Sequence, residues 1–180
     1  MLMRADQSVL MIVDVQERLV PVMADPRAVI YNCLRLLSAA SRLAIPYLVT
    51  EQYPKGIGPT VADIRQAIDP ENVFVKNHFS CVAEPGFLPR LAAQGRKQVV
   101  VAGIEAHVCV NQTVLDLKTA GYEVFVVAES CSSRRAEHAA EAFERMRQAG
   151  AAIVNVEMVI FEWLHRAGTP EFKELMGIVK

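Results

Sequence analysis

The chain has 180 residues, of which 52% are hydrophobic and 22% are charged. This balance is typical of a globular protein and excludes a disordered chain, and the length predicts a single domain over residues 1–180. Lys and Arg number 19 and Asp and Glu 20, so the net charge is −1. That charge gives no general attraction to nucleic acid or to an anionic membrane, and we expect neither as a partner.

The four cysteines are far apart and form no CxxC pair, which indicates reduced thiols and a cytoplasmic protein. No Cys and His have the spacing of a zinc site, so we expect no structural metal. The apolar run Val9–Val13 is too short to span a membrane and lacks the features of a signal peptide.

The first half of the chain predicts three strands separated by helices. Ser8–Val13 is the first strand, and Asp25 followed by Pro26 predicts a capped helix start. We expect later elements at residues 46–50 (strand), 60–67 (helix) and 73–75 (strand), with a loop at residues 56–59. The first helix has one apolar stripe, made of Val29, Cys33, Leu36, Leu37, Ala40 and Leu43.

In the second half, a helical stretch ends three times at a glycine and leads into a Val-rich run. Gly95, Gly121 and Gly150 suit the left-handed conformation that closes a helix. The runs that follow, residues 98–102, 123–128 and 152–156, lack polar alternation and are typical of parallel strands buried on both faces. Helices are expected at residues 87–94, 107–120, 134–149, 159–167 and 170–176. The buried stripe expected for the 134–149 helix is Ala136, Ala139, Ala140, Phe143 and Met146.

Six buried strands alternating with helices predict an α/β fold, a three-layer α/β/α sandwich with a doubly wound, mostly parallel sheet. The expected strand order is the Rossmann-like 3-2-1-4-5-6. Ligands in such folds bind at the carboxyl ends of the strands, near the point where the strand order reverses. Reactive side chains just after each strand are therefore the first candidates for a functional site.

Three such side chains are Asp14, Lys76 and Cys109, which follow the first, third and fourth strands. Because strands one and four are neighbours in this order, Asp14 and Cys109 are expected to face each other. Lys76 starts two strands away, about 10 Å, a distance that a lysine side chain largely spans. A carboxylate, an ammonium and a thiol are thus predicted to meet.

This combination suits nucleophilic catalysis. A helix start and a nearby cation favour the thiolate of Cys109, and Asp14 would take the thiol proton and later return it to a leaving group. Lys76 would orient Asp14 and balance its charge. From the residues alone, each also has a structural alternative: Cys109 as a small core residue, Asp14 as a loop cap and Lys76 as a surface lysine.

The motifs LMIVDVQ, VKNHFSC, VVVAGIEAHVCVNQT and VVAESCSSR occur in this order between about Ser8 and Trp163. Together they resemble the isochorismatase-like cysteine hydrolases, a family that includes nicotinamidases and N-carbamoylsarcosine amidase. The resemblance implies a hydrolase that cleaves an amide or ureide C–N bond of a small molecule through a thioester, without a cofactor. It also implies a homo-oligomer.

The resemblance assigns the catalytic triad to Asp14, Lys76 and Cys109. It further implies a cis peptide bond between Ile104 and Glu105, and an oxyanion hole formed by the backbone amides of Glu105 and Cys109. Nicotinamidases carry an Asp/His/His metal site after strand two, whereas residues 50–56 here contain no His. We therefore predict no metal there and do not expect nicotinamide as the substrate.

Further residues near the strand ends are candidates for the substrate pocket. His107 precedes Cys109 by two residues and would not face it on a helix, so we assign it no role as a base. Arg134 is expected to meet either a substrate carboxylate or a neighbouring chain. The pocket candidates are Gln16, Glu51, Gln52, Tyr53, His78, Phe79 and His107.

Three other interpretations stay open. An isochorismate-type vinyl ether hydrolase would not use Cys109. A redox protein would use Cys109 as a peroxide-sensitive thiolate with Cys131 as its partner. A binding protein would keep the fold without catalysis. The apolar residues Val159, Ile160, Phe161 and Trp163 predict either packing onto the sheet or a subunit interface.

Overall fold

The computed structural model describes residues 1–179 and contains one six-stranded sheet. The order is β3-β2-β1-β4-β5-β6 and every neighbouring pair is parallel, as predicted. The strands are β1 (Ser8–Val13), β2 (Tyr47–Gln52), β3 (Val73–Lys76), β4 (Gln98–Ile104), β5 (Glu123–Ser132) and β6 (Ala152–Val154).

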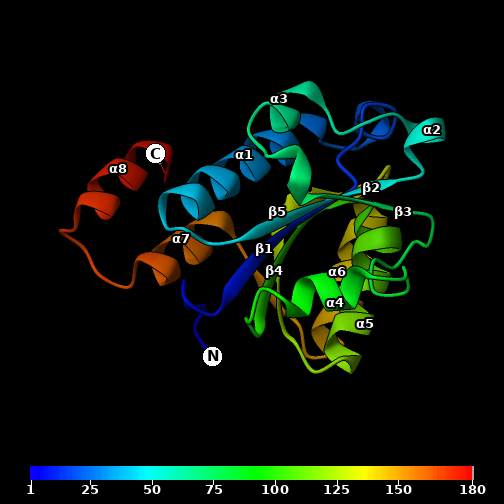
Figure 1. Cartoon of the computed structure of the whole chain (residues 1–180). Coiled ribbons are helices and arrows are strands. Elements are labelled where there is room, and N and C mark those ends of the chain that lie inside the picture. The colour runs from blue at the N-terminus through cyan, green and yellow to red at the C-terminus, as the bar shows by residue number, and fades with distance from the viewer. Residues whose placement is uncertain (180) are drawn as a thin grey trace.

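Helices cover both faces of the sheet and complete the predicted three layers (Figure 1). α1 and α7 lie on one face, and α4, α5 and α6 lie on the other. The helices are α1 (Pro26–Arg42), α2 (Pro54–Ile57), α3 (Ala62–Arg65), α4 (Phe87–Ala92), α5 (Asn111–Thr119), α6 (Ala136–Gln148), α7 (Val156–Leu164) and α8 (Pro170–Val179). Short turns are η1 (Val20–Val22), η2 (Pro70–Asn72) and the π-helical turn η3 (Ala106–Val110).

The sheet separates two hydrophobic cores, and β1 supplies both. Leu10 and Ile12 face the α1 side, whereas Val9 and Met11 face the α4–α6 side. All of β1 is buried, because its side chains alternate between two covered faces. The central strand is therefore a rigid support for the residue that follows it.

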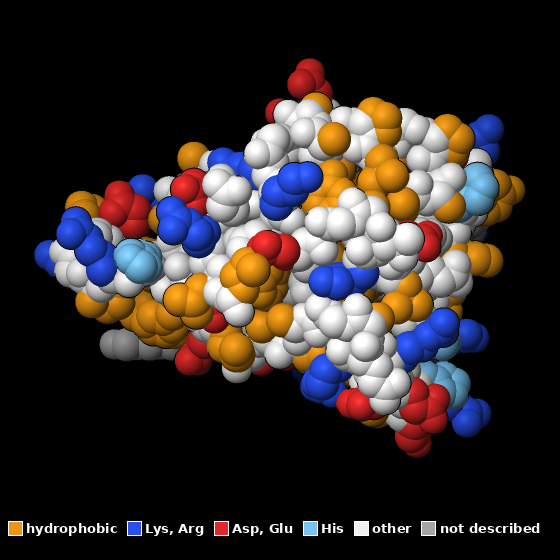
Figure 2. Space-filling view, turned by 90° about the horizontal axis from the view of Figure 1, so that it is seen from below, with side chains coloured by type: hydrophobic (Ala, Val, Ile, Leu, Met, Phe, Trp, Pro, Cys, Tyr) orange, Lys and Arg blue, Asp and Glu red, His pale blue; other side chains and the backbone are white. Residues whose placement is uncertain are grey.

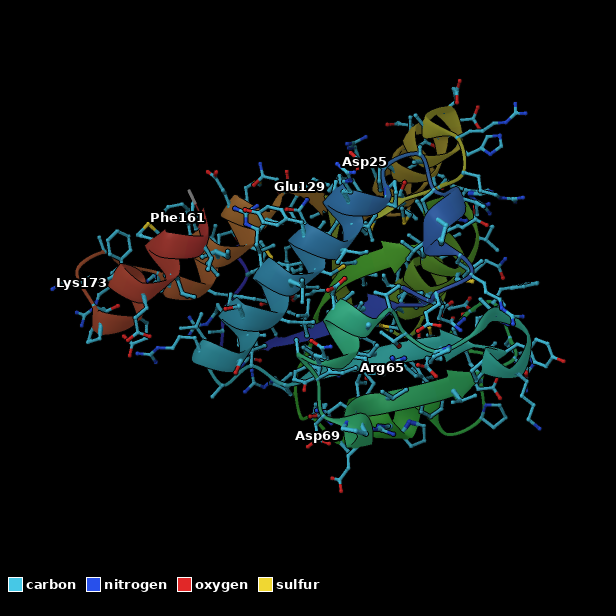
Figure 3. All side chains as sticks on the ribbon, turned by 90° about the horizontal axis from the view of Figure 1, so that it is seen from above. Asp25, Arg65, Asp69, Glu129, Phe161 and Lys173 are labelled. Carbon is cyan, nitrogen blue, oxygen red and sulfur yellow. The ribbon has the colours of Figure 1, made fainter. Side chains whose placement is uncertain are left out.

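The start of α1 is as predicted. The Asp25 side chain accepts a hydrogen bond from the Ala28 amide at 3.0 Å, and Pro26 occupies the first helical turn. Figure 3 labels Asp25 at this end of the helix. The predicted apolar stripe is buried except for Leu43, which is half-buried at the helix end. Gly95, Gly121 and Gly150 have the expected positive φ values of 67°, 84° and 85°.

Several boundaries differ from the predictions, and most differences lie near the site. Strands β2 and β3 run past their apolar residues, because Gln52 and Lys76 find partners inside the protein, and β4 and β5 also end later than predicted, at Ile104 and Ser132. The predicted 107–120 helix begins as a π-helical turn, and a short helix, α2, stands at the start of the predicted loop. On α6 the buried face contains Ala142, whereas Ala136 and Ala140 are exposed.

The C-terminal apolar segment serves mainly the core. Val159, Ile160 and Trp163 are buried, and the Trp163 indole donates a hydrogen bond to Ser8 Oγ at 3.0 Å. Phe161 is 44% exposed and lies at the α7–α8 end of the molecule (Figure 3). Hydrophobic side chains reach the surface in the view of Figure 2. Phe161 borders a groove of about 950 Å³ between the N-terminal segment and α7. No helix within residues 1–179 combines the length and the apolar character needed to cross a membrane.

Candidate active site

Asp14 directly follows β1 and has a positive φ of 51°. Asp adopts this left-handed region more readily than most residues. Its amide donates to the Thr50 carbonyl at 3.1 Å, and its carbonyl accepts from the Gln16 amide at 2.8 Å. The backbone of Asp14 is thus tied to β2 on one side and turns sharply after β1.

Gly103 allows the ends of β1 and β4 to approach each other closely. Its φ is 119°, and a Cβ built there would lie 2.1 Å from the Val13 carbonyl oxygen. Only glycine fits, because both the backbone conformation and the distance exclude a side chain. This approach brings the residue after β1 next to the segment that carries Cys109.

Lys76 and Asp14 form a buried ion pair. Lys76 Nζ lies 2.7 Å from Asp14 Oδ2, and both side chains are completely buried. Nζ also donates to Gln52 Oε1 at 2.6 Å and to the carbonyls of His78 and Phe79 at 3.2 and 3.1 Å. Removing a charge from water is costly unless it is paired and hydrogen-bonded, and the Lys76 ammonium meets both conditions.

The second oxygen of Asp14 is also occupied. Thr50 Oγ1 donates a hydrogen bond to Asp14 Oδ1 at 2.7 Å inside the protein. The two carboxylate oxygens are therefore fixed by different strands, Oδ1 by β2 and Oδ2 by β3. This arrangement orients Asp14 before any substrate arrives.

Cys109 lies on η3, is 6% exposed, and its thiol is near enough to Asp14 for the charge of that carboxylate to raise the thiol pKa. The structure thus brings together the three residues that the sequence analysis placed at separate strand ends. Asp14 is bonded to Lys76 and lies within electrostatic range of the Cys109 thiol. π-Helical turns are rare and are frequently found at functional sites.

The protonation state of Cys109 differs from the sequence-based expectation of a thiolate. Burial raises the pKa of the Cys109 thiol far above its usual range, and the negative charge of Asp14 raises it further, while Lys76 opposes both. For Lys76, burial by itself would lower the pKa of the ammonium, but the charge of Asp14 and its hydrogen bond raise that pKa overall. Burial and the charge of Asp14 therefore favour a neutral thiol beside the ion pair.

The segment before η3 contains the candidate oxyanion hole. The peptide bond between Ile104 and Glu105 is cis. Within residues 1–179 the Glu105 amide donates to no protein group, and its carbonyl accepts from the Val108 and Val110 amides. The Glu105 carboxylate accepts from Arg134 Nε at 3.0 Å, so Arg134 pairs within the chain.

Three pocket candidates are committed to internal hydrogen bonds. Gln16 bonds to the backbone of Gln52 in both directions and to the Gly58 carbonyl. Gln52 links Lys76 to the Asn77 carbonyl, and Glu51 accepts from both the amide and the hydroxyl of Thr60. Buried polar groups of this kind hold loops in place, so these residues support the walls of the site.

The aromatic candidates Tyr53 and Phe79 are 53% and 55% exposed. The backbone of each residue bonds to Lys76: the Tyr53 amide donates to the Lys76 carbonyl, and the Phe79 carbonyl accepts from Lys76 Nζ. The backbone position of both residues is therefore tied to Lys76.

The two histidine candidates have other contacts. His78 is exposed, and its Nδ1 lies 2.8 Å from Glu84 Oε2. Hydrogen bonds from the His78 amide and ring and from the Asn77 amide lower the pKa of the Glu84 carboxyl to about 2. His107 Nδ1 lies 2.9 Å from Ser133 Oγ, and its ring packs 4.9 Å from that of His138. Within the described residues, no group of three or more His, Cys, Asp or Glu has the arrangement of a metal site.

The sequence analysis missed Thr50 and gave Cys81 no role. Cys81 is fully buried, its Sγ lies 3.8 Å from Thr50 Oγ1, and burial followed by the charge of Asp14 raises the pKa of its thiol to about 12. Thr50 follows the apolar run of the second strand, so the strand-end rule that indicates Asp14 applies to it as well.

The model of the isochorismatase domain family matches residues 8–158. The chain belongs to the isochorismatase family. The secreted isochorismatase effector Isc1 of Phytophthora sojae is 40% identical over 178 residues, which cover 96% of this chain and 84% of that protein. These findings support an isochorismatase-family hydrolase.

Solved structures agree with this assignment. The MAR1 ribonuclease from Caenorhabditis elegans has a TM-score of 0.93 and 35% identity, covering 99% of this chain and 92% of its own. The YcaC gene product of Escherichia coli has a TM-score of 0.92 and 22% identity, and the match covers 98% of this chain and 90% of that chain. It is described as an octameric hydrolase of unknown specificity. At that identity the second likeness shows the fold alone.

Proposed function

We propose that this protein is a metal-independent cysteine hydrolase that cleaves an amide or ureide C–N bond of a small molecule through a thioester. The observation that carries this proposal is the fully buried ion pair of Asp14 and Lys76, at 2.7 Å, with the Cys109 thiol near enough for the charge of Asp14 to raise its pKa. A thiol held against a carboxylate whose other contacts are fixed is suited to proton transfer during nucleophilic attack.

In the first half of the reaction, Cys109 Sγ attacks the carbonyl carbon while its proton moves to Asp14. The amides of Glu105 and Cys109 would hold the resulting oxyanion. Asp14 then gives the proton to the leaving nitrogen as the C–N bond breaks, which leaves a thioester on Cys109. Because the resting thiol is neutral, proton transfer to Asp14 accompanies the attack instead of preceding it.

In the second half, Asp14 accepts a proton from a water molecule that attacks the thioester carbon. The second tetrahedral intermediate collapses, the C–S bond breaks and the proton returns to Cys109. Lys76 stays protonated throughout and balances the carboxylate, because its ammonium is held by Asp14, Gln52 and two backbone carbonyls. The cycle consumes one water and regenerates the triad.

The alternatives from the sequence have weaker support. Vinyl ether hydrolysis of the isochorismate type needs no thiol, whereas in this chain the Cys109 thiol lies near enough to Asp14 for its pKa to be raised by that charge. A peroxide-sensitive redox site needs a thiolate, but burial raises the pKa of both Cys109 and Cys131, the latter to about 12. A non-catalytic protein has no need for a buried carboxylate, ammonium and thiol in contact.

RNA cleavage is a second candidate, because the C. elegans relative is described as a ribonuclease. The net charge of −1 does not favour it, since binding to the phosphate backbone depends on Lys and Arg. Incubation with single-stranded RNA decides between the two: loss of cleavage in Cys109→Ala would assign RNA hydrolysis to this site.

We also propose a cytoplasmic homo-oligomer. The four cysteines are free thiols, which suits a reducing compartment, and the exposed apolar groove beside Phe161 suits a subunit contact. Light scattering at micromolar concentration tests the assembly, and a mass equal to one chain would contradict it.

The experiment for the main proposal is ammonia release from a panel of amides and ureides, followed by mass spectrometry of the enzyme. We expect turnover of at least one compound, an acyl adduct on the Cys109 peptide, and loss of both in Cys109→Ala. Cys33→Ala is the matched control, because Cys33 is a buried thiol away from the triad. A substrate that Cys109→Ala hydrolyses at the wild-type rate would overturn the cysteine mechanism.

A further inference from the structure

A second polar site lies on the other side of the turn that carries Cys109. A cleft of about 340 Å³ separates the η3–α5 junction from α6, and we call it the α6 cleft. Only one of its lining side chains is apolar, unlike the walls of the two cores. The lining residues are His107, Asn111, His138, Glu141, Ala142 and Arg145.

Two buried atoms on residues that line the α6 cleft lack hydrogen-bond partners. In the part of the chain that the structure describes, three buried side-chain polar atoms have no partner, and two of them are Asn111 Oδ1 and His138 Nδ1. Asn111 is 3% exposed. Because buried polar atoms are nearly always hydrogen-bonded, this concentration indicates a partner from outside the chain. Asn111 Oδ1 requires a donor, such as an N–H group.

The cleft also presents two unpaired charges of opposite sign. Glu141 and Arg145 are four residues apart on α6, a spacing at which Glu and Arg commonly form an ion pair. Within residues 1–179 neither takes part in a salt bridge, whereas Glu144 and Arg147 on the same helix pair at 2.7 Å. A carboxylate and a guanidinium, separated by about 6 Å along the helix axis, are therefore both available to a ligand.

We propose that the α6 cleft binds a small zwitterion of the α-amino-acid type, with an ammonium and a carboxylate attached to the same carbon. Its ammonium would donate to Asn111 Oδ1 and Glu141. Its carboxylate would accept from Arg145, whose guanidinium suits a bidentate contact. No bond is made or broken in this site, and the proposal does not depend on the hydrolase mechanism.

The position of the cleft gives such binding a consequence for the nucleophile. His107 and Asn111 stand two residues before and two residues after Cys109, so the wall of the cleft and the nucleophile share one turn of backbone. His107 is fixed on its other side by Ser133. An occupant held by Asn111 would therefore restrain the turn that positions the Cys109 thiol.

The test is a nuclear magnetic resonance titration of the ¹⁵N-labelled full chain with L-alanine, propionate and ethylamine. Propionate lacks the ammonium of alanine, and ethylamine lacks its carboxylate. We expect L-alanine to shift the Asn111 side-chain amide and the η3 backbone amides saturably, and each analogue to bind at least about tenfold more weakly. The same loss is expected for L-alanine with Glu141→Gln and with Arg145→Gln.

Arg147→Gln is the control, because it removes a charge from the same helix outside the cleft. It should bind L-alanine as the wild type does, and matched melting temperatures establish that the variants are folded. Three results would overturn the proposal: no shift with any of the three probes at about 50 mM, equal binding of propionate and L-alanine, or unchanged L-alanine binding in both charge variants.

Discussion

The two sides of the turn that carries Cys109 differ in how completely their polar atoms are paired. On the side toward β1, both carboxylate oxygens of Asp14 are hydrogen-bonded, and Lys76 makes four polar contacts. On the side toward α6, two buried polar atoms have no partner within the described residues. A paired buried network holds one geometry, which suits covalent chemistry, whereas unpaired buried atoms indicate a place for a ligand.

The largest effect on the paired side is expected from Gly103→Ala. A Cβ there would lie 2.1 Å from the Val13 carbonyl oxygen, so β1 and β4 must move apart and separate Asp14 from Cys109. We expect the free energy of unfolding to fall by more than about 3 kcal/mol, measured by urea denaturation.

Gly86→Ala is the matched control, because Gly86 has a similar positive φ of 89° and a Cβ added there would have no atom within 4 Å. That variant should lose only about 1–2 kcal/mol, the cost of the left-handed conformation itself. Equal losses in the two variants would show that close approach at Gly103 is unimportant.

The second effect concerns the buried charge pair. Lys76→Met leaves the Asp14 carboxylate buried without its counter-charge, and such changes cost about 3–5 kcal/mol. In the double variant Asp14→Asn with Lys76→Met the charge is gone, so part of the lost stability should return. Urea denaturation of the two single variants and the double variant measures this coupling, and strictly additive losses would contradict a direct pair.

The third effect tests Thr50 as a positioning residue. Thr50→Val keeps the shape of the side chain but removes the donor to Asp14 Oδ1. Hydrogen bonds to charged groups contribute about 1.5–3 kcal/mol, so turnover of the substrate found in the panel should fall roughly 10- to 100-fold. Thr50→Ser keeps the donor and should retain most of the rate. If both variants lost the same activity, packing and not orientation would be the role of Thr50.

The smallest effect is expected in the loop after β3, where the Glu84 carboxylate accepts hydrogen bonds from the amides of residues 77 and 78. Its folded-state pKa is lowered to about 2 from 4.5, so its contribution to stability is present above pH 4.5 and is lost as the pH falls toward 2. Thermal unfolding of wild type and Glu84→Gln should therefore differ at pH 7 and converge below pH 4.5. A difference that stays constant down to pH 2 would contradict this role.

The sequence was sufficient for the fold because its strongest signals are local. The Val-rich runs, the closing glycines and the Asp25–Pro26 helix start each predict one element, and the strand order follows from βα connections. The predicted ends of strands were wrong where polar residues extend the strand, as at Gln52 and Lys76, because those residues depend on partners distant in sequence.

For the site, the sequence indicated which residue types stand at the strand ends but not their environment. Burial of Cys109 beside Asp14 reverses the expected direction of the thiol pKa, and burial is a property of the folded protein alone. Gln16, Gln52 and His78 have the side chains of pocket residues, yet their hydrogen bonds go to other parts of the chain. The α6 cleft combines residues from η3, α5 and α6, which local patterns do not place together.

The central claim is that Cys109 is a neutral thiol whose proton moves to Asp14 during attack. The most direct measurement is the alkylation rate of Cys109 as a function of pH, followed by peptide mass spectrometry in wild type and Asp14→Asn. The charge of Asp14 raises the pKa of the Cys109 thiol and Lys76 lowers it. In the Asp14→Asn variant, Cys109 should therefore be alkylated at a lower pH than in the wild type, and turnover should be lost. A midpoint that stays the same or moves to higher pH in Asp14→Asn would contradict the account.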